Sequence, residues 1–446
     1  MNIPDYVMRF MDTFRKAGFE IFLVGGAVRD LLLEKTTDNW DFTSNAKPED
    51  IQKLFVDAYY NNIYGTVTVP MDIEDQTMLM EITPYRKEED YTDGRHPDKI
   101  SWADTIEEDL ARRDFTINAM ACDGEKIIDL FGGQKDLRTG MIKSVGDPDR
   151  RFNEDALRLL RAVRFASQLG FLIEEKTRES ITSNAYLIAK ISWERIRDEF
   201  LKILASEHPA EGVLFLKNTG LLKRILPEVD VCFNVQQKSP KRHHIYDVGT
   251  HLVMSLKHCP SKDPLVRFAA LIHDIGKERT YRKDPETQLI TFHNHEVVGT
   301  VQAKQIADRF KLSNKQKEKL VRLVEHHQFT VSEDVSDKGV RRFIRDVGLE
   351  YVNDMLDLRT ADRIGSGATP TSWRLDLFKK RIIEVQQEPF QVKDLKINGY
   401  DVMKTLGIDP GKQIGDTLDA IFAEVEEGKL KNEREVLMKR LEEFKK

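Results

Sequence analysis

The sequence predicts an α+β protein, with a mixed head at residues 1–145 followed by a helical remainder. Short apolar or alternating runs that are typical of strands are confined to the head. From Asp149 onward, apolar residues recur at three- and four-residue spacing, which is the period of a helix. At 446 residues the chain is longer than one hydrophobic core usually organises, so several structural units are expected.

Each element has its own signal. MNIPDYVMRFMDTFRKAGF reads as an amphipathic helix, IFLVGG as a short strand ending in glycines, and residues 63–85 as a hairpin. FTINAMACDGEKIIDL predicts two further strands. EDALRLLRAVRFASQL and WERIRDEFLKILA each predict one helix. Polar, turn-rich breaks at 234–244 and 363–372 bracket a segment of distinct composition.

Composition excludes several classes of protein. No apolar run approaches the roughly 20 residues that cross a bilayer, and the N-terminus does not resemble a secretion signal, so a cytoplasmic protein without a membrane segment is expected. Cys122, Cys232 and Cys259 include no C-x-x-C pair, which argues against a disulfide framework and a thiolate zinc site. The net charge of −6 does not decide about nucleic acid, because binding depends on where the charge lies.

A strand followed by glycines and a helix marks a candidate phosphate site. Gly25 and Gly26 precede AVRDLLL, so backbone N–H groups and a helix N-terminus would face the end of the strand. The alternative is an ordinary tight turn. Asn39 and Asp41 follow in the strand-like run NWDF, where alternation puts both side chains on one face. Two oxygen donors so placed can hold Mg²⁺.

A set of motifs occurs in a fixed order over roughly the first 200 residues: GGAVRD, a D-x-D-like strand, RRDFTINAMA, DLFGG and EDALRLLRAVRFA. As an ordered set they resemble the class II CCA-adding enzymes of the DNA polymerase β superfamily. The resemblance implies a template-independent tRNA nucleotidyltransferase with a polymerase β-like head, Mg²⁺ as cofactor, and CTP, ATP and the acceptor–TΨC arm of tRNA as partners. It assigns catalysis to Asp41, Asn39 and Arg112, the triphosphate to Gly25, Gly26 and Arg29, and the nucleotide pocket to Arg112, Asp155, Arg158, Arg161 and Arg164.

Asn39 departs from the family pattern, in which the matching position carries a metal-binding carboxylate. Asp38 is displaced by one residue, onto the opposite side of a strand. An Asn carbonyl can bind Mg²⁺ but carries no charge, so the affinity for the cation should weaken. Three explanations stay open: a working site that tolerates Asn39, a bulge that lets Asp38 substitute, and an inactive site.

Asp155 and Arg158 are the candidates for choosing the base. Three residues apart on one predicted helix, they would be neighbours. Cytosine and adenine each present an amino donor beside a ring-nitrogen acceptor, so an accepting Asp and a donating Arg pair with both and repel uracil and guanine. The alternative is an exposed ion pair. Arg164 lies roughly opposite Asp155 on an ideal helix, so its place in the pocket rests on the resemblance alone.

Other segments allow two interpretations each. On composition, residues 85–102 are a mobile loop, and in the family this stretch looks like the flexible loop that helps the site change from CTP to ATP, which favours a product ending in A. Arg113 and Asp114 belong to the head motif or form a buried pair. The C-terminal lysines contact tRNA phosphates or form a solvated helix face. These are Lys404, Lys412, Lys429 and Lys431.

Most of the 11 histidines lie between residues 243 and 327. One lies on a predicted helix, an adjacent His-Asp pair ends an apolar helix, and an Asp lies on a later helix. This order is similar to the HD superfamily of metal-dependent phosphohydrolases, which implies a divalent transition metal. Its ligands would be His251, His273, Asp274 and Asp362. A second metal or a phosphate would bind His295, His326 and His327. Phosphoester hydrolysis is a hypothesis, with a structural remnant as the alternative.

The expected organisation is a nucleotidyltransferase head (1–145), a helical neck and body that bind base and RNA (146–245), an inserted all-α HD domain (246–370) and a helical tail that binds tRNA (371–446). Three functions compete with full CCA addition. They are an A-adding tRNA nucleotidyltransferase, a poly(A) polymerase, and an RNA-binding or HD-hydrolase protein whose polymerase site has decayed.

Overall fold

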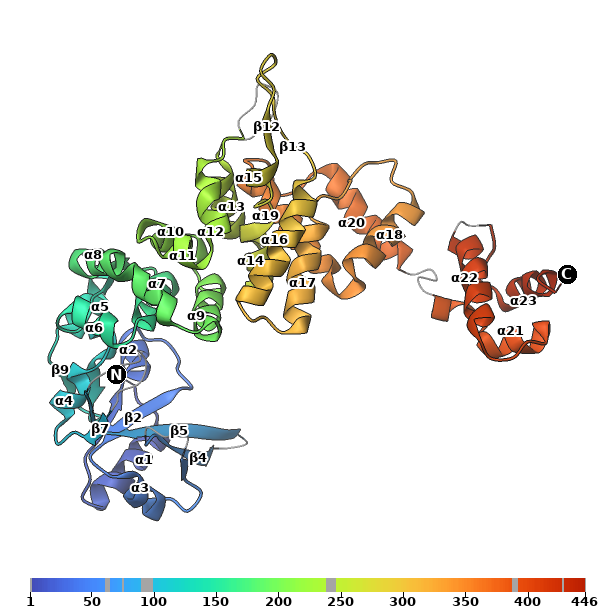
Figure 1. Ribbon diagram of the computed structural model, residues 1–446. Coiled ribbons are helices and arrows are strands. Elements are labelled where there is room, and N and C mark those ends of the chain that lie inside the picture. Colours follow the sequence, from blue (N-terminus) through green and yellow to red (C-terminus); the bar gives the residue numbers. More distant parts are fainter. Residues whose placement is uncertain are drawn as a thin grey trace.

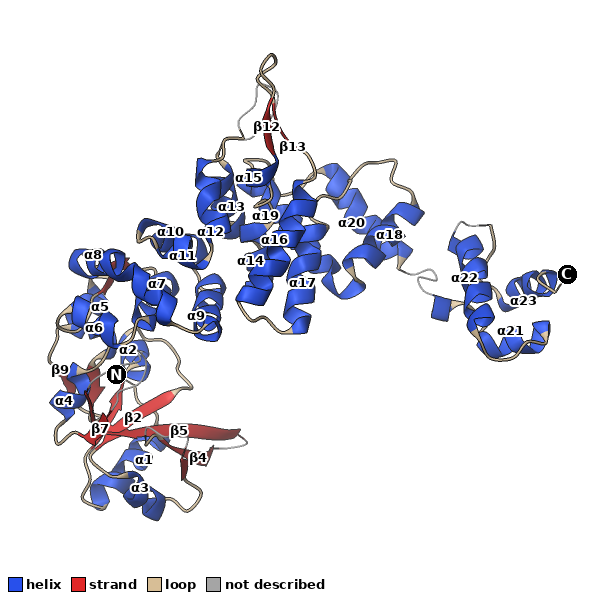
Figure 2. Ribbon diagram, in the orientation of Figure 1, coloured by secondary structure: helices blue, strands red, loops and turns tan. Residues whose placement is uncertain are grey.

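The computed structural model describes residues 2–60, 65–73, 76–89, 99–237, 246–386, 392–426 and 429–445. Its strands gather in the head and its helices form nearly all of the rest, which confirms the α+β class (Figure 2). The head, the helical middle and the tail follow one another in chain order (Figure 1). No helix among the described residues is both long enough and apolar enough to span a bilayer.

The head is built on one sheet with the strand order β3-β4-β5-β2-β1-β8-β9. The strands are β1 (Ile21–Val24), β2 (Trp40–Ser44), β3 (Tyr59–Tyr60), β4 (Val67–Ile73), β5 (Gln76–Pro84), β8 (Met120–Cys122) and β9 (Ile127–Asp129). β2 and β5 are parallel, whereas the other neighbours are antiparallel. The strand at IFLV, the hairpin β4–β5 and the pair β8–β9 are confirmed, so alternation predicted the sheet's strands well.

Helices pack on this sheet through their apolar faces. They are α1 (Asp5–Lys16), α2 (Gly26–Leu32), α3 (Pro48–Leu54), α4 (Ile106–Ala111) and α5 (Gly133–Arg138). The predicted amphipathic helix at the N-terminus is α1, whose Phe10 ring lies 5.0 Å from that of Phe42 in β2. The segment 85–102 was expected to be a loop, but its ends pair as the antiparallel strands β6 (Arg86–Glu89) and β7 (Lys99–Trp102). Residues 90–98 lie outside the described part of the chain.

The helix predicted in the neck begins later than expected. α7 (Leu157–Leu169) confirms the helix over EDALRLLRAVRFASQL except at its first three residues, because Asp155 has an extended backbone (φ −142°, ψ 106°) and separates α7 from α6 (Pro148–Glu154). The Asp155 carboxylate accepts the backbone N–H of Leu157 at 3.0 Å, which satisfies a donor at the start of α7. The body follows with α8 (Glu175–Asn184), α9 (Trp193–Ala205), α10 (Pro209–Asn218), α11 (Leu221–Ile225) and α12 (Pro227–Asp230). α9 confirms the helix predicted at WERIRDEFLKILA.

The histidine-rich segment is helical. Its helices are α13 (Val248–Lys257), α14 (Pro264–Ile272), α15 (Lys277–Thr280), α16 (His295–Arg309), α17 (Asn314–Glu325), α18 (Asp337–Val347), α19 (Val352–Gly365) and α20 (Trp373–Val385). Short strands that the sequence did not indicate also occur: β12 (Tyr281–Lys283) pairs with β13 (Ile290–Phe292), and β10 (Met141–Ile142) with β11 (Leu172–Ile173). One continuous core runs from α1 in the head to α19.

The tail has a core of its own. α21 (Gly399–Leu406), α22 (Lys412–Glu426) and α23 (Arg434–Glu443) bury Val402, Ile421 and Leu437 among themselves. α20 instead packs on α18 through Ile382 and Ile344, so the expected boundary at 370 falls inside that packing unit. Figure 1 shows α21–α23 set apart from α18 and α20.

Candidate functional site

The turn between β1 and α2 lies against two arginines. Gly25 has φ +66°, a conformation that favours glycine, and a Cβ there would lie 3.1 Å from Nη1 of Arg113. A Cβ on Gly26, where α2 begins, would lie 3.5 Å from Nη2 of Arg29. A phosphate beside this turn would therefore meet backbone N–H groups and guanidinium cations together.

Asn39 and Asp41 lie on one face of the sheet, as alternation predicted. Asn39 precedes β2 and donates from Nδ2 to Oδ2 of Asp41 at 3.2 Å. The pKa of Asp41 is raised to about 6, mainly by burial and also by the charge of Glu81, while the charges of Arg113 and Arg29 oppose the rise. Asp41 thus combines partial burial with a second carboxylate nearby, which is the environment that a cation relieves.

Glu81 completes an acidic group that the sequence interpretation missed. It pairs in register with Asp41 across the parallel strands β2 and β5. Met80 and Ile82, its neighbours in β5, are both fully buried, so Glu81 faces the opposite side, as Asp41 does between Trp40 and Phe42. The signal was present, since Glu81 is a charged residue inside an apolar strand. What the sequence did not show is that β5 pairs with β2.

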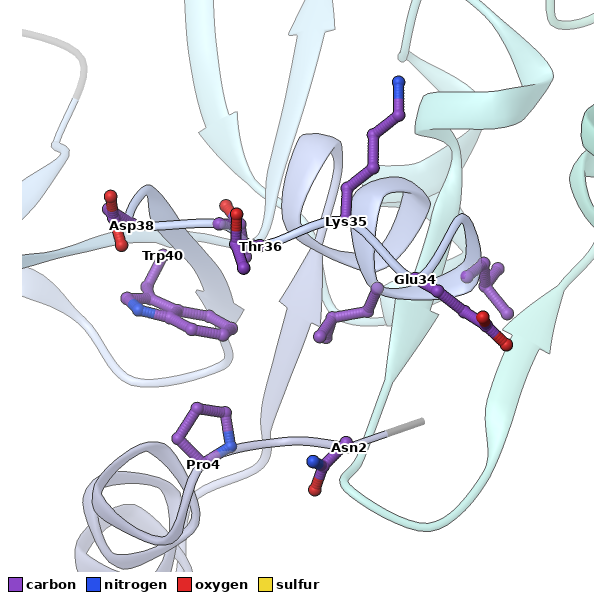
Figure 3. A pocket seen from close by; sticks show the side chains of 10 residues that line it. Asn2, Pro4, Glu34, Lys35, Thr36, Asp38 and Trp40 are labelled. Carbon is purple, nitrogen blue, oxygen red and sulfur yellow. The ribbon is translucent and has the colours of Figure 1, made fainter.

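Asp38 and Asn39 both precede β2. The strand pairs one-to-one with β5 from Trp40 to Ser44, so no bulge lies within these residues, and the bulge explanation for Asp38 stays open. Asp38 lines a cavity of about 840 Å³, together with Pro4, Lys35 and Thr36, whose lining includes neither Asn39 nor Asp41 (Figure 3). Asp38 thus lines a cavity that Asp41 does not line.

Arginines from the head and neck converge on Phe165 in α7. The guanidinium carbons of Arg29, Arg161 and Arg164 lie 5.4, 5.3 and 4.1 Å from the centre of its ring. Arg164 forms an ion pair with Glu199 of α9 at 2.6 Å. The structure therefore places Arg164 with Arg29 and Arg161, although its helical position alone suggested otherwise.

Arg113 and Asp114 do not pair with each other. Arg112 and Arg113 both bind Asp109, at 2.7 and 3.1 Å, while Asp114 binds Arg161 at 2.6 Å. The buried Arg113–Asp114 pair is wrong because the two side chains leave the chain in different directions. Burial by itself would raise the pKa of Asp114, but the charges of Arg161 and Arg158 and its hydrogen bonds hold it at about 2.

Asp155 and Arg158 lie close in the chain but each binds other groups. Asp155 pairs with Arg195 of α9 at 3.0 Å. Arg158 pairs with Glu154 at 2.7 Å and donates to the backbone carbonyls of Arg151 and Arg112. Because Asp155 stands at the break between helices, the expectation of two neighbours on one regular helix is wrong; their role toward a base stays a prediction.

The predicted ligands of the histidine-rich segment do come together. His251 lies on α13, His273 and Asp274 follow α14, and Asp362 lies on α19. Nε2 of His251 is 3.2 Å from Nε2 of His273, 3.3 Å from Oδ2 of Asp274 and 3.4 Å from Oδ1 of Asp362. Four potential ligand atoms thus surround one point, and three of the residues are almost wholly buried.

A second group shares Asp274. Its other oxygen, Oδ1, lies 3.1 Å from Nε2 of His295 and 3.5 Å from Nε2 of His327. His326 does not join this group and lines a separate cavity beside Phe329, so its assignment as a ligand is wrong. Both residues follow the end of α17 at Glu325, and of the two His327 is the buried one, within 3.5 Å of Asp274.

A cation and an open cavity adjoin both groups. Lys277, one turn after Asp274, lies 2.5 Å from its Oδ2. Burial would raise the pKa of Asp274, but the Lys277 and His273 charges hold it well below its usual value. The cavity measures about 470 Å³, and Lys277, Gln328 and Arg359 line it with Asp274. The sequence interpretation missed Lys277 and Arg359.

The remaining candidates are less informative. Lys404, Lys412, Lys429 and Lys431 are exposed on the tail, as either interpretation requires. All three cysteines are buried and free.

Comparison with known proteins accounts for most of the chain. Residues 21–143 match the poly A polymerase head domain, residues 170–233 the probable RNA and SrmB-binding site of polymerase A, and residues 284–441 the tRNA nucleotidyltransferase domain 2. The chain is 31% identical to the CCA-adding enzyme of Ligilactobacillus salivarius over 453 residues, which is 98% of this chain and 96% of that one. It is also 31% identical to the A-adding tRNA nucleotidyltransferase of Deinococcus radiodurans, over 90% of both chains.

A solved structure supports the same grouping. The Bacillus stearothermophilus CCA-adding enzyme in complex with CTP is similar at a TM-score of 0.73 and 27% identity, covering 100% of this chain and 98% of that one. The two folds are therefore similar over the whole length of this chain. The chain belongs to the family of CCA-adding enzymes, the tRNA nucleotidyltransferases that build the 3′ end of tRNA from CTP and ATP without a nucleic-acid template.

Proposed function

We propose that nucleotidyl transfer takes place between the acidic group on β2 and β5 and the arginines of the head and neck. The 3′-hydroxyl of tRNA attacks the α-phosphate of CTP, and then of ATP. The bond from the α-phosphate to the β-phosphate breaks, and pyrophosphate leaves. The observation that carries this proposal is the common face of Asn39, Asp41 and Glu81 beside Arg29 and Arg113.

The acidic group fits Mg²⁺. Carboxylate and amide oxygens are the ligands that Mg²⁺ prefers, and Asp41 lies close enough to Glu81 for its pKa to rise. When bound, Mg²⁺ neutralises the triphosphate and activates the attacking hydroxyl. Since the amide of Asn39 is uncharged, Asp41 and Glu81 supply the negative charge.

The other residues divide between phosphate and base. Gly25, Gly26 and Arg29 serve the triphosphate, while Arg112, Arg161 and Arg164 belong to the nucleotide pocket. Asp155 accepts from the amino group of cytosine or adenine, and Arg158 donates to the adjacent ring nitrogen. The acceptor–TΨC arm of tRNA is recognised by duplex shape and phosphate, with the exposed tail lysines contributing charge. Nucleotide addition takes place in the cytoplasm, with tRNA as the acceptor.

Sizing the products tests the proposal. The chain is incubated with a tRNA that ends at the discriminator base and with CTP, ATP or both. Addition of two residues with CTP and of three with both is expected. One residue with ATP alone, and only on a tRNA that already ends in CC, would identify an A-adding enzyme like the relative from Deinococcus radiodurans. Long A tails on any RNA would identify a poly(A) polymerase, and no product would favour a decayed site.

A second function is supported by the histidine-rich cluster. We propose two divalent transition-metal sites bridged by Asp274, one with His251, His273 and Asp362, the other with His295 and His327. Mixed imidazole and carboxylate donors suit such metals, and the two oxygens of Asp274 face the two groups separately. With metal bound, these residues would hold a centre that supplies an activated water for phosphoester hydrolysis, in which a water oxygen would bond to phosphorus as the ester P–O bond breaks and the alcohol leaves with a proton.

Adjacent histidines supply a matched test of this second function. His327→Ala should lower bound metal and hydrolysis of bis-p-nitrophenyl phosphate roughly a hundredfold, whereas His326→Ala should change neither, because only His327 faces Asp274. CTP addition by the same preparations shows that each variant is folded. Purified protein without metal, or equal hydrolysis by both variants, would contradict the proposal.

A further inference from the structure

Asp155 has no regular helix to orient it. It stands in extended conformation between α6 and α7, so the direction of its carboxylate depends on side-chain contacts. Two contacts fix it: Oδ1 accepts the N–H of Leu157 at 3.0 Å, and Oδ2 binds Nη2 of Arg195 at 3.0 Å. Each carboxylate oxygen has two lone pairs, so both contacts leave a lone pair for a base.

Arg195 binds Asp155 through one of its two terminal nitrogens. It projects from α9, and its other terminal nitrogen, Nη1, is buried without a hydrogen-bond partner among the described residues. A buried donor without a partner is unfavourable, and an arginine serving only a surface ion pair would turn both nitrogens to water. The ion pair with Asp155 is therefore the contact that holds the Arg195 guanidinium.

Arg158 is held by a separate set of contacts. Glu154 and the backbone carbonyls of Arg151 and Arg112 bind its guanidinium, whereas Arg195 binds the carboxylate of Asp155. The two groups assigned to reading the base can thus be disturbed independently. A change at Arg195 should affect recognition of the amino group and leave recognition of the ring nitrogen in place.

We propose that Arg195 is a positioning residue that sets nucleotide selectivity, by holding the Asp155 carboxylate toward the amino group of cytosine or adenine. This rests on the base-reading role proposed above for Asp155. Without Arg195, the carboxylate rotates about its remaining contact with Leu157. It then accepts less well from CTP and repels the carbonyl oxygen of UTP less strongly, so the two nucleotides become harder to distinguish.

Arg195→Ala should lower the ratio of kcat/KM for CTP to that for UTP by roughly tenfold, measured on a tRNA ending at the discriminator base. Arg197→Ala is the matched control. Arg197 lies on the same helix with the same 24% side-chain exposure, but binds Asp198 and the carbonyl of Lys311 instead. The ratio of kcat/KM for CTP to that for UTP should not change in Arg197→Ala. Arg195→Lys keeps the positive charge but replaces the planar guanidinium with a single ammonium group, so it should give an intermediate ratio. This variant provides the test if Arg195→Ala does not fold.

The possible outcomes distinguish failure of the positioning role of Arg195 from failure of the base-reading role of Asp155. If Asp155→Ala lowers the ratio but neither Arg195 variant does, Asp155 reads the base and the positioning role is wrong. The positioning role is also wrong if Arg195→Ala slows CTP and UTP addition equally, because a merely structural residue would act that way. If Asp155→Ala leaves the ratio unchanged, the base-reading assignment itself fails.

Discussion

At the scale of single residues, the acidic group on β2 differs from a pair of carboxylates spaced one residue apart. Asn39 occupies one of the two positions, and its side-chain amide donates a hydrogen bond to Asp41. Glu81, from another strand, supplies the second charge beside Asp41. Two charges remain at the site, but they come from different strands, so the proposed cation site lies across the β2–β5 pair instead of along β2.

The exchange Asn39→Asp should therefore lower the Mg²⁺ concentration that gives half-maximal CTP addition, by roughly tenfold, because a third carboxylate joins Asp41 and Glu81. Titrating Mg²⁺ in the addition assay measures this. Asp38→Asn is the control and should leave the titration unchanged, since Asp38 lines a different cavity. A parent without activity at any Mg²⁺ concentration, restored by Asn39→Asp, would instead favour the decayed site.

At the scale of elements, close packing of backbone positions the histidine cluster. Gly276 follows Asp274 by two residues and begins the turn into α15. Its φ of −62° suits any residue, so glycine is required there for space. A Cβ at this position would lie 2.1 Å from the carbonyl oxygen of His295 and 2.7 Å from the amide nitrogen of Gly299, both in α16. Contact at this distance ties Asp274 and His295 to one another.

Gly276→Ala should force α15 and α16 apart and destabilise the chain by about 1–3 kcal/mol. It should also reduce bound metal, because His295 moves away from Asp274. Thermal unfolding and metal analysis of the same preparation report the two effects. Gly415→Ala in α22 provides the comparison: its added methyl meets open space and should leave both quantities nearly unchanged. Equal behaviour of the two variants would show that the α15–α16 contact does not matter.

At the scale of the whole molecule, two of the hydrophobic cores of the described residues differ in extent: a long one and a separate one in the tail. The first runs without interruption from Phe10 in α1 to Met355 in α19, joining the head to the histidine cluster through the neck. The second lies within α21–α23. The head and cluster are therefore expected to unfold together, and the tail on its own.

Leu437→Ala tests this division, because Leu437 is fully buried in the tail core. The substitution should destabilise the tail by about 2–5 kcal/mol. Hydrogen exchange on the full chain should then become faster in α21–α23 and stay unchanged in β1, β2 and α7. Faster exchange throughout would show that the tail shares its stability with the rest.

The sequence by itself determined what depends on local pattern. Alternation placed Asn39 and Asp41 on one face, helical spacing located α9, and the order of histidines and aspartates predicted the cluster of His251, His273, Asp274 and Asp362 that the structure brings together. Tertiary structure decided which segments meet. Strand pairing brings Glu81 beside Asp41, and helix packing brings Arg195 to Asp155. The turn after α17 directs His327, and not His326, toward Asp274. A local pattern fixes the face on which a side chain lies, but only the packing of distant segments fixes what that face meets.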